Sequence, residues 1–361
     1  MKINKKTFIV AGEVSGDKLG GWYIKKFALT NVEAVGGPFL RNAGAYIYKP
    51  LKELNVAGIV EILKHLPRIL SFLKNLANYI LSQNFDEVVL IDFPGFNLRL
   101  AKILKKKNPN IKITYLSPPQ LWAWGSWRIR SLKKYCDRVI VIYPFEVEWY
   151  KSRGLAVEWH GYPFYEEIEK FAISKRSEKK PKIALLPASR TSELTTLFPR
   201  FAAATEKFMN AHPEVDVVIP LASTIPVKKI EKAFSDKTRK RIRIIQDESE
   251  KYEALSQCCM ALTKPGTITL ELALLGIPSI VAFRTSWLSY YIGKAIVNIE
   301  YMALPNLLMN KEVFPEYLQC ECTEEKLFDA MEKLYQSWQN QNKNYQDIID
   351  NLEKLKSRLK A

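Results

Sequence analysis

Long apolar runs are missing from this sequence of 361 residues. The most apolar long stretch, residues 270–283, is interrupted by Glu271, Gly276 and Pro278, whereas a membrane-spanning helix needs about 20 apolar residues. The apolar run at residues 8–11 is too short for the hydrophobic region of a signal peptide. We therefore expect a protein that is neither exported nor integral to a membrane.

Cysteine and histidine are also scarce. The five cysteines, an odd number, include no Cys-x-x-Cys pair and have no histidine-rich neighbour, so the usual pattern of a structural zinc site is absent. Free thiols in a reducing cytosol are the expected state. Of the three histidines, His160 alone follows a predicted strand and is a candidate for acid–base chemistry.

Three sequence motifs of catalytic sites are absent as well. No Gly-x-x-x-x-Gly-Lys-Ser/Thr loop is present, which argues against phosphate binding of the ATPase kind. No Gly-x-Ser-x-Gly sequence is present, which argues against a serine hydrolase elbow. No Asp-x-Asp sequence occurs, which removes the usual carboxylate pair that holds a nucleotide sugar through a metal. We therefore predict neither a metal nor another cofactor.

The composition is typical of a soluble globular protein, with 47% hydrophobic and 25% charged residues. The 54 Lys and Arg exceed the 38 Asp and Glu by 16, and the first 170 residues carry 26 basic against 15 acidic side chains. Such a field attracts phosphate groups on nucleic acid, an anionic bilayer or a small substrate. Because the basic residues are dispersed and no aromatic RNA-binding motif accompanies them, we predict no nucleic-acid partner.

Short apolar, β-branched runs alternate with helical patterns, which predicts an α/β protein with parallel sheets. Residues 174–182, SKRSEKKPK, have no large apolar side chain and are typical of a linker. We predict a domain at 1–172, a linker at 173–182, a second domain at 183–322 and helices at 323–361. Two doubly wound, Rossmann-like domains would face a cleft at the carboxyl ends of their strands, where such sheets bind ligands. The expected strands are 7–11, 87–91, 112–116, 138–142, 182–186, 215–219, 241–245, 260–263 and 279–282, and the expected helices include 17–27, 56–81, 193–211, 252–257 and 267–275.

Two candidate sites follow strands of the first domain. Gly12 and Gly16 flank Glu13 and Ser15 in a loop that allows close backbone approach and ends at a helix N-terminus. An ordinary strand-to-helix turn fits the same spacing. Asp92 ends the buried run VVLID, where partial desolvation raises a carboxyl pKa and suits it to act as a general base. A helix-capping aspartate fits this position equally well.

Two more candidate sites lie in the second domain. Ser189 and Arg190 end the sequence LLPASR before a predicted helix, so a hydroxyl, a guanidinium and helix-end amides are available to a diphosphate. In KPGTITLE, Gly266 and Thr267 open a helix and Glu271 lies one turn on, on the same face as Thr267. A surface arginine and a capped core helix are the alternatives. Together the two loops favour a nucleotide-diphosphate site.

The ordered set of loops resembles the lipid-A-disaccharide synthase family, two-domain glycosyltransferases of the GT-B type. The resemblance reaches to about Thr323 and implies inverting transfer of 2,3-diacylglucosamine from its UDP donor to 2,3-diacylglucosamine 1-phosphate. The products would be UDP and the β-1,6 disaccharide of lipid A. Another UDP-sugar enzyme of this fold, a 2-epimerase or a transferase with a soluble acceptor, is the alternative. The resemblance rests on AGEVSGD at 11–17, NVAGIVEIL at 55–63, LIDFPGFN at 90–97, YLSPPQLWAW at 115–124, LLPASR at 185–190, GTITLE at 266–271 and EYMALPNLL at 300–308.

The resemblance also implies roles for single residues. Asp92 would be the general base, and Asn306 matches a Leu-Pro-Asn residue of the substrate site. Three positions depart from the family pattern: Ala188 replaces a glycine, Gly95 stands where an acidic residue is frequent, and Tyr162 stands where the family has a histidine. The implied sets are Asp92, Glu13 and Ser15 for catalysis, Gly12, Gly16 and Asn306 for substrate, and Ser189, Arg190, Gly266, Thr267 and Glu271 for UDP.

The same resemblance places the enzyme in the cytoplasm, attached peripherally to the inner face of the cytoplasmic membrane. The pattern at residues 56–81 predicts an amphipathic helix, kinked at Pro67, with Lys64, Arg68 and Lys74 near its apolar face. Such a helix suits anionic headgroups and acyl chains, although a long buried helix has the same pattern. The expected partners are the two diacylated sugars and an anionic membrane surface, with homo-oligomerisation left open.

Overall fold

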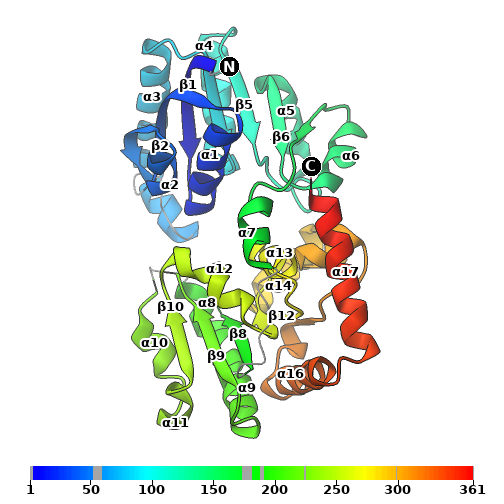
Figure 1. Ribbon diagram of the computed structural model, residues 1–361. Helices are drawn as coiled ribbons and strands as arrows, with labels where there is room; N and C mark the ends of the chain where they lie inside the picture. The colour runs from blue at the N-terminus through cyan, green and yellow to red at the C-terminus, as the bar shows by residue number, and fades with distance from the viewer. Residues whose placement is uncertain are drawn as a thin grey trace. The chain divides into compact units, whose positions relative to one another are not determined.

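The computed structural model describes residues 3–51, 59–172, 181–187, 191–222, 225–297 and 299–360. It divides into two compact units, one reaching to Phe164 and the other spanning Tyr165–Lys360, and each is built on one parallel sheet (Figure 1). The division precedes the expected boundary at 172 because α7 (Tyr165–Ala172) packs against α12 (Glu248–Ser256) and α13 (Thr267–Leu274) of the second unit. Most of the expected linker, residues 173–180, lies outside the described residues.

In the described part of the first unit, seven strands pair in the order β3-β2-β1-β4-β5-β6-β7. The central strands β1, β4 and β5 bury apolar side chains on both faces, as a helix-covered parallel sheet requires; they include residues 8–11 of β1, 88–91 of β4 and 115–116 of β5. The expected strands at 87–91 and 112–116 are found without shift. The strands are β1 (Ile3–Ala11), β2 (Leu29–Gly36), β3 (Tyr46–Pro50), β4 (Glu87–Ile91), β5 (Lys112–Leu116), β6 (Arg138–Val141) and β7 (Glu158–Trp159).

Helices cover both faces of this sheet, which confirms the doubly wound prediction. Phe8 and Val10 of β1 pack into one apolar cluster, while the alternate residues Ile9 and Ala11 pack into the other. The helices are α1 (Val14–Lys26), α2 (Pro38–Asn42), α3 (Ile59–Ser82), α4 (Pro94–Lys107), α5 (Ile129–Tyr135) and α6 (Pro144–Lys151).

Helix α3 runs through Pro67 as one helix. Its second half places Leu73, Leu76 and Ile80 in the core of the first unit, so this half matches the alternative of a buried helix. Residues 56–58 of the expected membrane helix, and the side chains of residues 59–66 with Lys64, lie outside the described part of the chain.

The described strands of the second unit pair in the order β10-β9-β8-β11-β12-β13. Strand β8 is the switch point, because the chain moves from it toward β9 on one side and later returns to β11 on the other. All five strands expected here are present within a residue or so, and β13 is an addition. They are β8 (Lys182–Leu186), β9 (Asp216–Pro220), β10 (Ile242–Ile245), β11 (Met260–Thr263), β12 (Ser279–Phe283) and β13 (Glu316–Leu318).

The helix expected at 193–211 is two helices, α8 (Thr191–Thr196) and α9 (Phe198–Ala211). Pro199 stands in the first turn of α9, where its missing N–H costs nothing and its ring stops a helix arriving from before it. The shorter helices that follow are α10 (Val227–Glu231), α11 (Asp236–Arg239), α14 (Trp287–Ile296) and α15 (Leu304–Met309).

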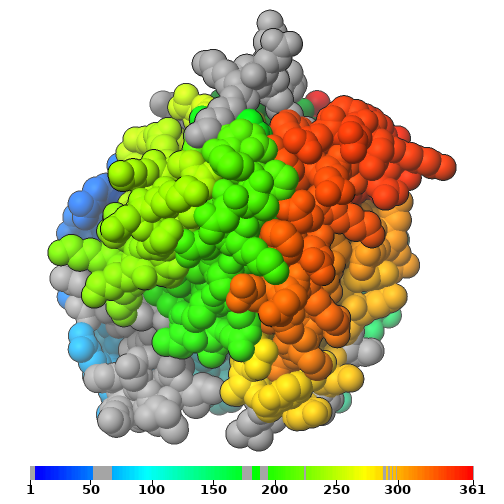
Figure 2. Space-filling view, turned by 90° about the horizontal axis from the view of Figure 1, so that it is seen from below, coloured from blue at the N-terminus to red at the C-terminus, as the bar shows by residue number. Residues whose placement is uncertain are grey.

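The chain ends in two helices, as expected, α16 (Glu324–Gln339) and α17 (Lys343–Leu359). Helix α16 lies beside α9, far from it in sequence, and places Leu327, Met331 and Tyr335 in the core of the second unit (Figures 1 and 2). Helix α17 contacts α13 and α15. The C-terminal helices therefore belong to the second unit. All five cysteines are free thiols, as predicted.

Candidate active site

Three neighbouring strands of the first unit end in register. Ala11 of β1 pairs with Ile91 of β4, which pairs with Leu116 of β5. The residues that follow these ends therefore meet at one edge of the sheet, and they include the loop at residues 12–16 and Asp92. Sequence reasoning placed both there, and the structure brings them together.

The backbone at Asp92 has an uncommon conformation. Asp92 and Phe93 both have φ 46°, in the left-handed region that non-glycine residues rarely adopt. The Phe93 ring lies against Gly12, so closely that a Cβ at position 12 would be 2.5 Å from Phe93 Cγ. Gly12 is thus required by a close approach between the two loops, rather than by its own backbone angles.

The Asp92 carboxyl has a raised pKa. Burial is the main cause, the nearby Glu13 carboxylate adds to it, and a hydrogen bond from the Phe93 amide acts in the opposite direction. A carboxyl that holds its charge less readily is a stronger base once ionised, which suits it to take a proton from a hydroxyl group. Glu13, the N-cap residue of α1, and Ser15, in the first turn of α1, are exposed, and Gly16 is buried.

Two buried side chains hold the Asp92 turn, and sequence reasoning missed both. Tyr115 Oη donates to the Asp92 carbonyl oxygen at 2.6 Å. Asn97 Nδ2 donates to the same oxygen at 2.9 Å and to the Ile91 carbonyl at 3.0 Å. Both residues lie within motifs quoted above, YLSPPQ and DFPGFN, but only the fold brings the tyrosine to the aspartate.

The second unit has a cavity of about 190 Å³ at the carboxyl edge of its sheet. It lies at the ends of β8, β9, β10 and β11, beside the switch point where open α/β sheets bind ligands. Its lining includes Lys251, Lys264, Thr267, Ile268 and Glu271. The predicted residues Thr267 and Glu271 are thus confirmed as neighbours on one wall.

Glu271 forms an ion pair with Lys251, whose Nζ lies 2.7 Å from Glu271 Oε2. Burial works against the charge of Lys251, yet the carboxylates of Glu271 and Glu248 raise its pKa above the usual value. The side chain of Tyr252 is buried beside them, and its pKa is raised by burial and by Glu271. Lys251 was not predicted, because only the fold brings α12 against α13.

Gly266 precedes α13 with φ 137°, a conformation that favours glycine, and no atom lies within 4 Å of a Cβ built there. Thr267 and Ile268 open α13 and line the cavity, so the positive end of this helix is at the site. The other predicted loop, with Ala188, Ser189 and Arg190, lies outside the described residues.

Asn306 is completely buried, and its carboxamide is fully used inside the protein. Its Nδ2 donates to the Phe314 carbonyl at 2.7 Å and to Glu316 at 2.9 Å. Its Oδ1 accepts from the Val313 and Phe314 amides. Asn306 therefore connects α15 to β13 and to the segment before it through hydrogen bonds. Its expected contact with substrate stays a prediction.

Two further polar residues have structural partners. His160 Nε2 lies 2.8 Å from Glu158, which also binds Arg138, and these partners lower the pKa of Glu158 to about 2. Asp17, after Gly16, accepts from the amides of Gly37, Phe39 and Leu40 and so caps α2.

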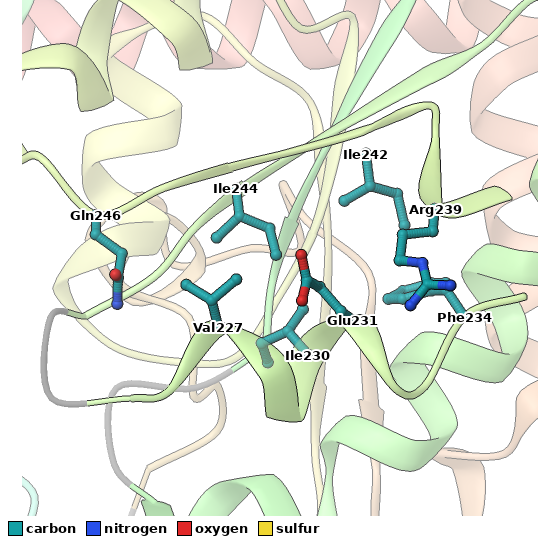
Figure 3. Close-up of a pocket in the computed structure, with 8 residues that line it drawn as sticks. All are labelled: Val227, Ile230, Glu231, Phe234, Arg239, Ile242, Ile244 and Gln246. Atoms are coloured by element: carbon teal, nitrogen blue, oxygen red, sulfur yellow. The ribbon is translucent and has the colours of Figure 1, made fainter. Parts of the chain in front are cut away.

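A second cavity of the second unit, about 320 Å³, lies between α10 and the edge strand β10 (Figure 3). Glu231 projects into it among apolar side chains, and no residue predicted for the site lines it. In the described ranges, no group of three or more His, Cys, Asp or Glu side chains could hold a metal ion. No described helix is both long and apolar enough to span a membrane.

A family model described as lipid-A-disaccharide synthetase matches residues 7–361. The chain belongs to the lipid-A-disaccharide synthase family. The lipid-A-disaccharide synthase of Nitrosococcus oceani is 34% identical over 341 residues, covering 90% of this chain and 85% of its own. Lipid-A-disaccharide synthase 1 of Legionella pneumophila strain Paris is 33% identical, covering 99% and 94%. The chain is therefore a glycosyltransferase of lipid A biosynthesis.

Solved structures with the same fold confirm the GT-B prediction. A putative UDP-N-acetylglucosamine 2-epimerase from Listeria monocytogenes is similar with a TM-score of 0.61 at 13% identity, covering 96% of this chain and 90% of its own. Acinetobacter baumannii MurG is similar with a TM-score of 0.57 at 13% identity, covering 99% and 96%. At these identities the similarity extends to the fold alone.

Proposed function

We propose that this glycosyltransferase moves 2,3-diacylglucosamine from its UDP donor to 2,3-diacylglucosamine 1-phosphate, releasing UDP. The observation that carries the proposal is the family match over residues 7–361, because it includes both the Asp92 loop and the GTITLE helix. Such a transfer needs a base for the acceptor hydroxyl and a site for UDP. The carboxyl with a raised pKa at Asp92 and the cavity at the start of α13 are the candidates for these two parts.

The reaction is a displacement with inversion at the anomeric carbon. The 6-hydroxyl oxygen of the acceptor forms the new bond, and its proton goes to Asp92. The bond from the anomeric carbon to the diphosphate breaks, and UDP leaves with the electron pair. Positive groups and hydrogen-bond donors must stabilise the departing charge. We assign this to the guanidinium of Arg190, the hydroxyl of Ser189 and the N-terminus of α13. Glu271, fixed by Lys251, would accept hydrogen bonds from the ribose hydroxyls.

The first-unit loop completes the assignment. Gly12 and Gly16 would let the acceptor approach the backbone, and Glu13 and Ser15, both exposed, would hydrogen-bond its sugar. Asn306 would hold α15 against β13 and the segment before it through its buried hydrogen bonds.

The test is UDP release from the diacylated donor, with and without the monosaccharide 1-phosphate acceptor. The proposal expects release that depends on the acceptor, together with a disaccharide product. Conversion of a UDP-sugar to its 2-epimer, or equal release with an acceptor that lacks acyl chains, would favour the alternative enzymes of this fold.

We further propose peripheral attachment to an anionic membrane. The net charge of +16 supports it, and so does the aromatic group on α14, where Trp287 and Tyr291 are 49% and 62% exposed. Their rings stack with centroids 5.8 Å apart, and Lys294 follows on the same helix. Exposed Trp, Tyr and Lys together suit the boundary between lipid headgroups and acyl chains.

A further inference from the structure

The turn after β4 holds two successive non-glycine residues, Asp92 and Phe93, in the left-handed region. This conformation is disfavoured for L-residues and persists only where the surroundings determine it. Such strain gathers at functional sites because it fixes a side chain in a direction that relaxed backbone would not give. The residues that impose this conformation therefore help to set the direction of the Asp92 side chain.

The surroundings act on one atom, the Asp92 carbonyl oxygen. Tyr115 Oη donates to it at 2.6 Å and Asn97 Nδ2 at 2.9 Å. Both donors come from completely buried residues, Tyr115 from the neighbouring strand β5 and Asn97 from α4. The Asp92 amide in turn donates to the Leu116 carbonyl at 3.1 Å. The peptide group between Asp92 and Phe93 is thus held by hydrogen bonds from two elements, β5 and α4.

We propose that Tyr115 is a positioning residue for the reaction, acting through Asp92. Its hydroxyl holds the Asp92 carbonyl, so the turn keeps its left-handed form and the carboxyl stays beside the Glu13 loop. Asn97 is the second side chain that donates to the same carbonyl oxygen. The inference rests on the proposed role of Asp92 as the general base.

Tyr115→Phe removes only the hydroxyl and leaves the ring in the core. The Asp92 carbonyl keeps its bond from Asn97, so the fold has no reason to be lost, but the turn gains freedom to relax. A reacting group displaced by about 1 Å can lose about 100-fold in rate. We therefore expect kcat to fall by about 10- to 100-fold, with the KM for the UDP donor within about twofold of wild type.

Tyr150→Phe is a matched control. Tyr150 is also completely buried in the core of the first unit, and its hydroxyl also donates to a backbone carbonyl, that of Pro119, at 3.0 Å. Both variants lose one buried tyrosine hydrogen bond to the backbone. If the effect of Tyr115→Phe is general loss of packing, the two variants will have equal kcat values, and this result overturns the proposal.

The double variant Asp92→Asn with Tyr115→Phe tests the route of the effect. If Tyr115 acts through Asp92, removing its hydroxyl from the Asp92→Asn protein leaves the residual rate unchanged within about twofold, because the base is already gone. A further drop of tenfold or more overturns the proposal. Asn97→Ala provides a second test should Tyr115→Phe not fold, and it must lower kcat with KM unchanged.

Failure of the proposed function has a different signature. Wild-type protein that releases no UDP in the presence of both diacylated sugars contradicts that function. Wild-type turnover with Tyr115→Phe as active as Tyr150→Phe contradicts the positioning role alone.

Discussion

Lys251 and Glu271 meet at the wall of the second-unit cavity, with Nζ 2.7 Å from Oε2. The pair fixes a carboxylate one helical turn from Thr267, at the start of α13. A fixed carboxylate is suited to two neighbouring hydroxyls of a ribose, and this relationship leads to the first prediction.

Glu271→Gln should weaken UDP binding by about 1.5 to 3 kcal/mol, the range for hydrogen bonds to a charged group. Arg190→Ala should have an effect of similar size on the diphosphate. Calorimetric titration with UDP measures both. Glu250→Gln on the same helix as Lys251 is the control, since it removes only an exposed pair with Arg243. Unchanged UDP affinity in Glu271→Gln and Arg190→Ala would contradict the nucleotide assignment.

Glu146→Gln should flatten the pH dependence of stability. Burial raises the pKa of Glu146 from 4.5 to about 7, so between these values the folded protein binds more protons than the unfolded chain. Its free energy of unfolding must then fall as pH rises through this window, by up to about 1.4 kcal/mol per pH unit. The glutamine variant has no such proton to lose.

The measurement for Glu146 is the melting temperature at pH 5 and at pH 7.5. The melting temperature of the wild type should fall more between pH 5 and pH 7.5 than that of Glu146→Gln. Glu148→Gln, at an exposed position of the same helix, should behave as wild type. Parallel losses in wild type and Glu146→Gln would show that the carboxyl does not titrate in this window.

Gly12→Ala should disturb the Asp92 turn. The added Cβ would lie 2.5 Å from Phe93 Cγ, so the ring and the turn must shift, with a loss of about 1 to 3 kcal/mol in stability and a clear fall in kcat. Gly95→Ala is the contrasting variant, because nothing lies within 4 Å of a Cβ there. It should be neutral or stabilise the protein by up to about 1 kcal/mol. Chemical denaturation compares them, and equal stabilities would contradict the close-approach argument.

Membrane attachment should be reversible and weaken with salt, because the Debye length falls from about 10 Å at 0.1 M to about 3 Å at 1 M. Replacing Trp287 and Tyr291 by alanine should lower co-flotation with anionic vesicles. Tyr46→Ala, which removes an aromatic residue exposed on β3, should not. Equal flotation at both salt concentrations, or of the α14 variant and wild type, would contradict attachment through charge and α14.

Much of the fold follows from local pattern. Residues 88–91 of β4 and 260–262 of β11 are uninterrupted apolar runs with polar residues next to them, so the ends of these strands can be read from the sequence. Strands β2 and β13 were not predicted because each mixes exposed or partly exposed positions with polar residues and lies away from the centre of its sheet. Their pairing depends on neighbours distant in the sequence.

The position of a candidate residue was predictable where one strand end determines it, as the end of β4 determines that of Asp92; its catalytic role stays a prediction. It was not predictable where distant elements meet. Tyr115 reaches Asp92, and Lys251 reaches Glu271, only through contacts between separate strands and helices. For Asn306 the motif located the residue but did not indicate its environment. Its side-chain amide is already fully hydrogen-bonded inside the protein.

The most direct test of this account is Asp92→Asn, with turnover and UDP affinity measured on the same preparation. The variant keeps the shape of the side chain but cannot accept the acceptor's proton, so kcat should fall by roughly 10² to 10⁴. UDP affinity should be unchanged, because the nucleotide contacts are assigned to the second unit. Turnover within about tenfold of wild type, with a melting temperature several degrees lower, would make Asp92 a structural residue and leave Glu13 as the next base to test.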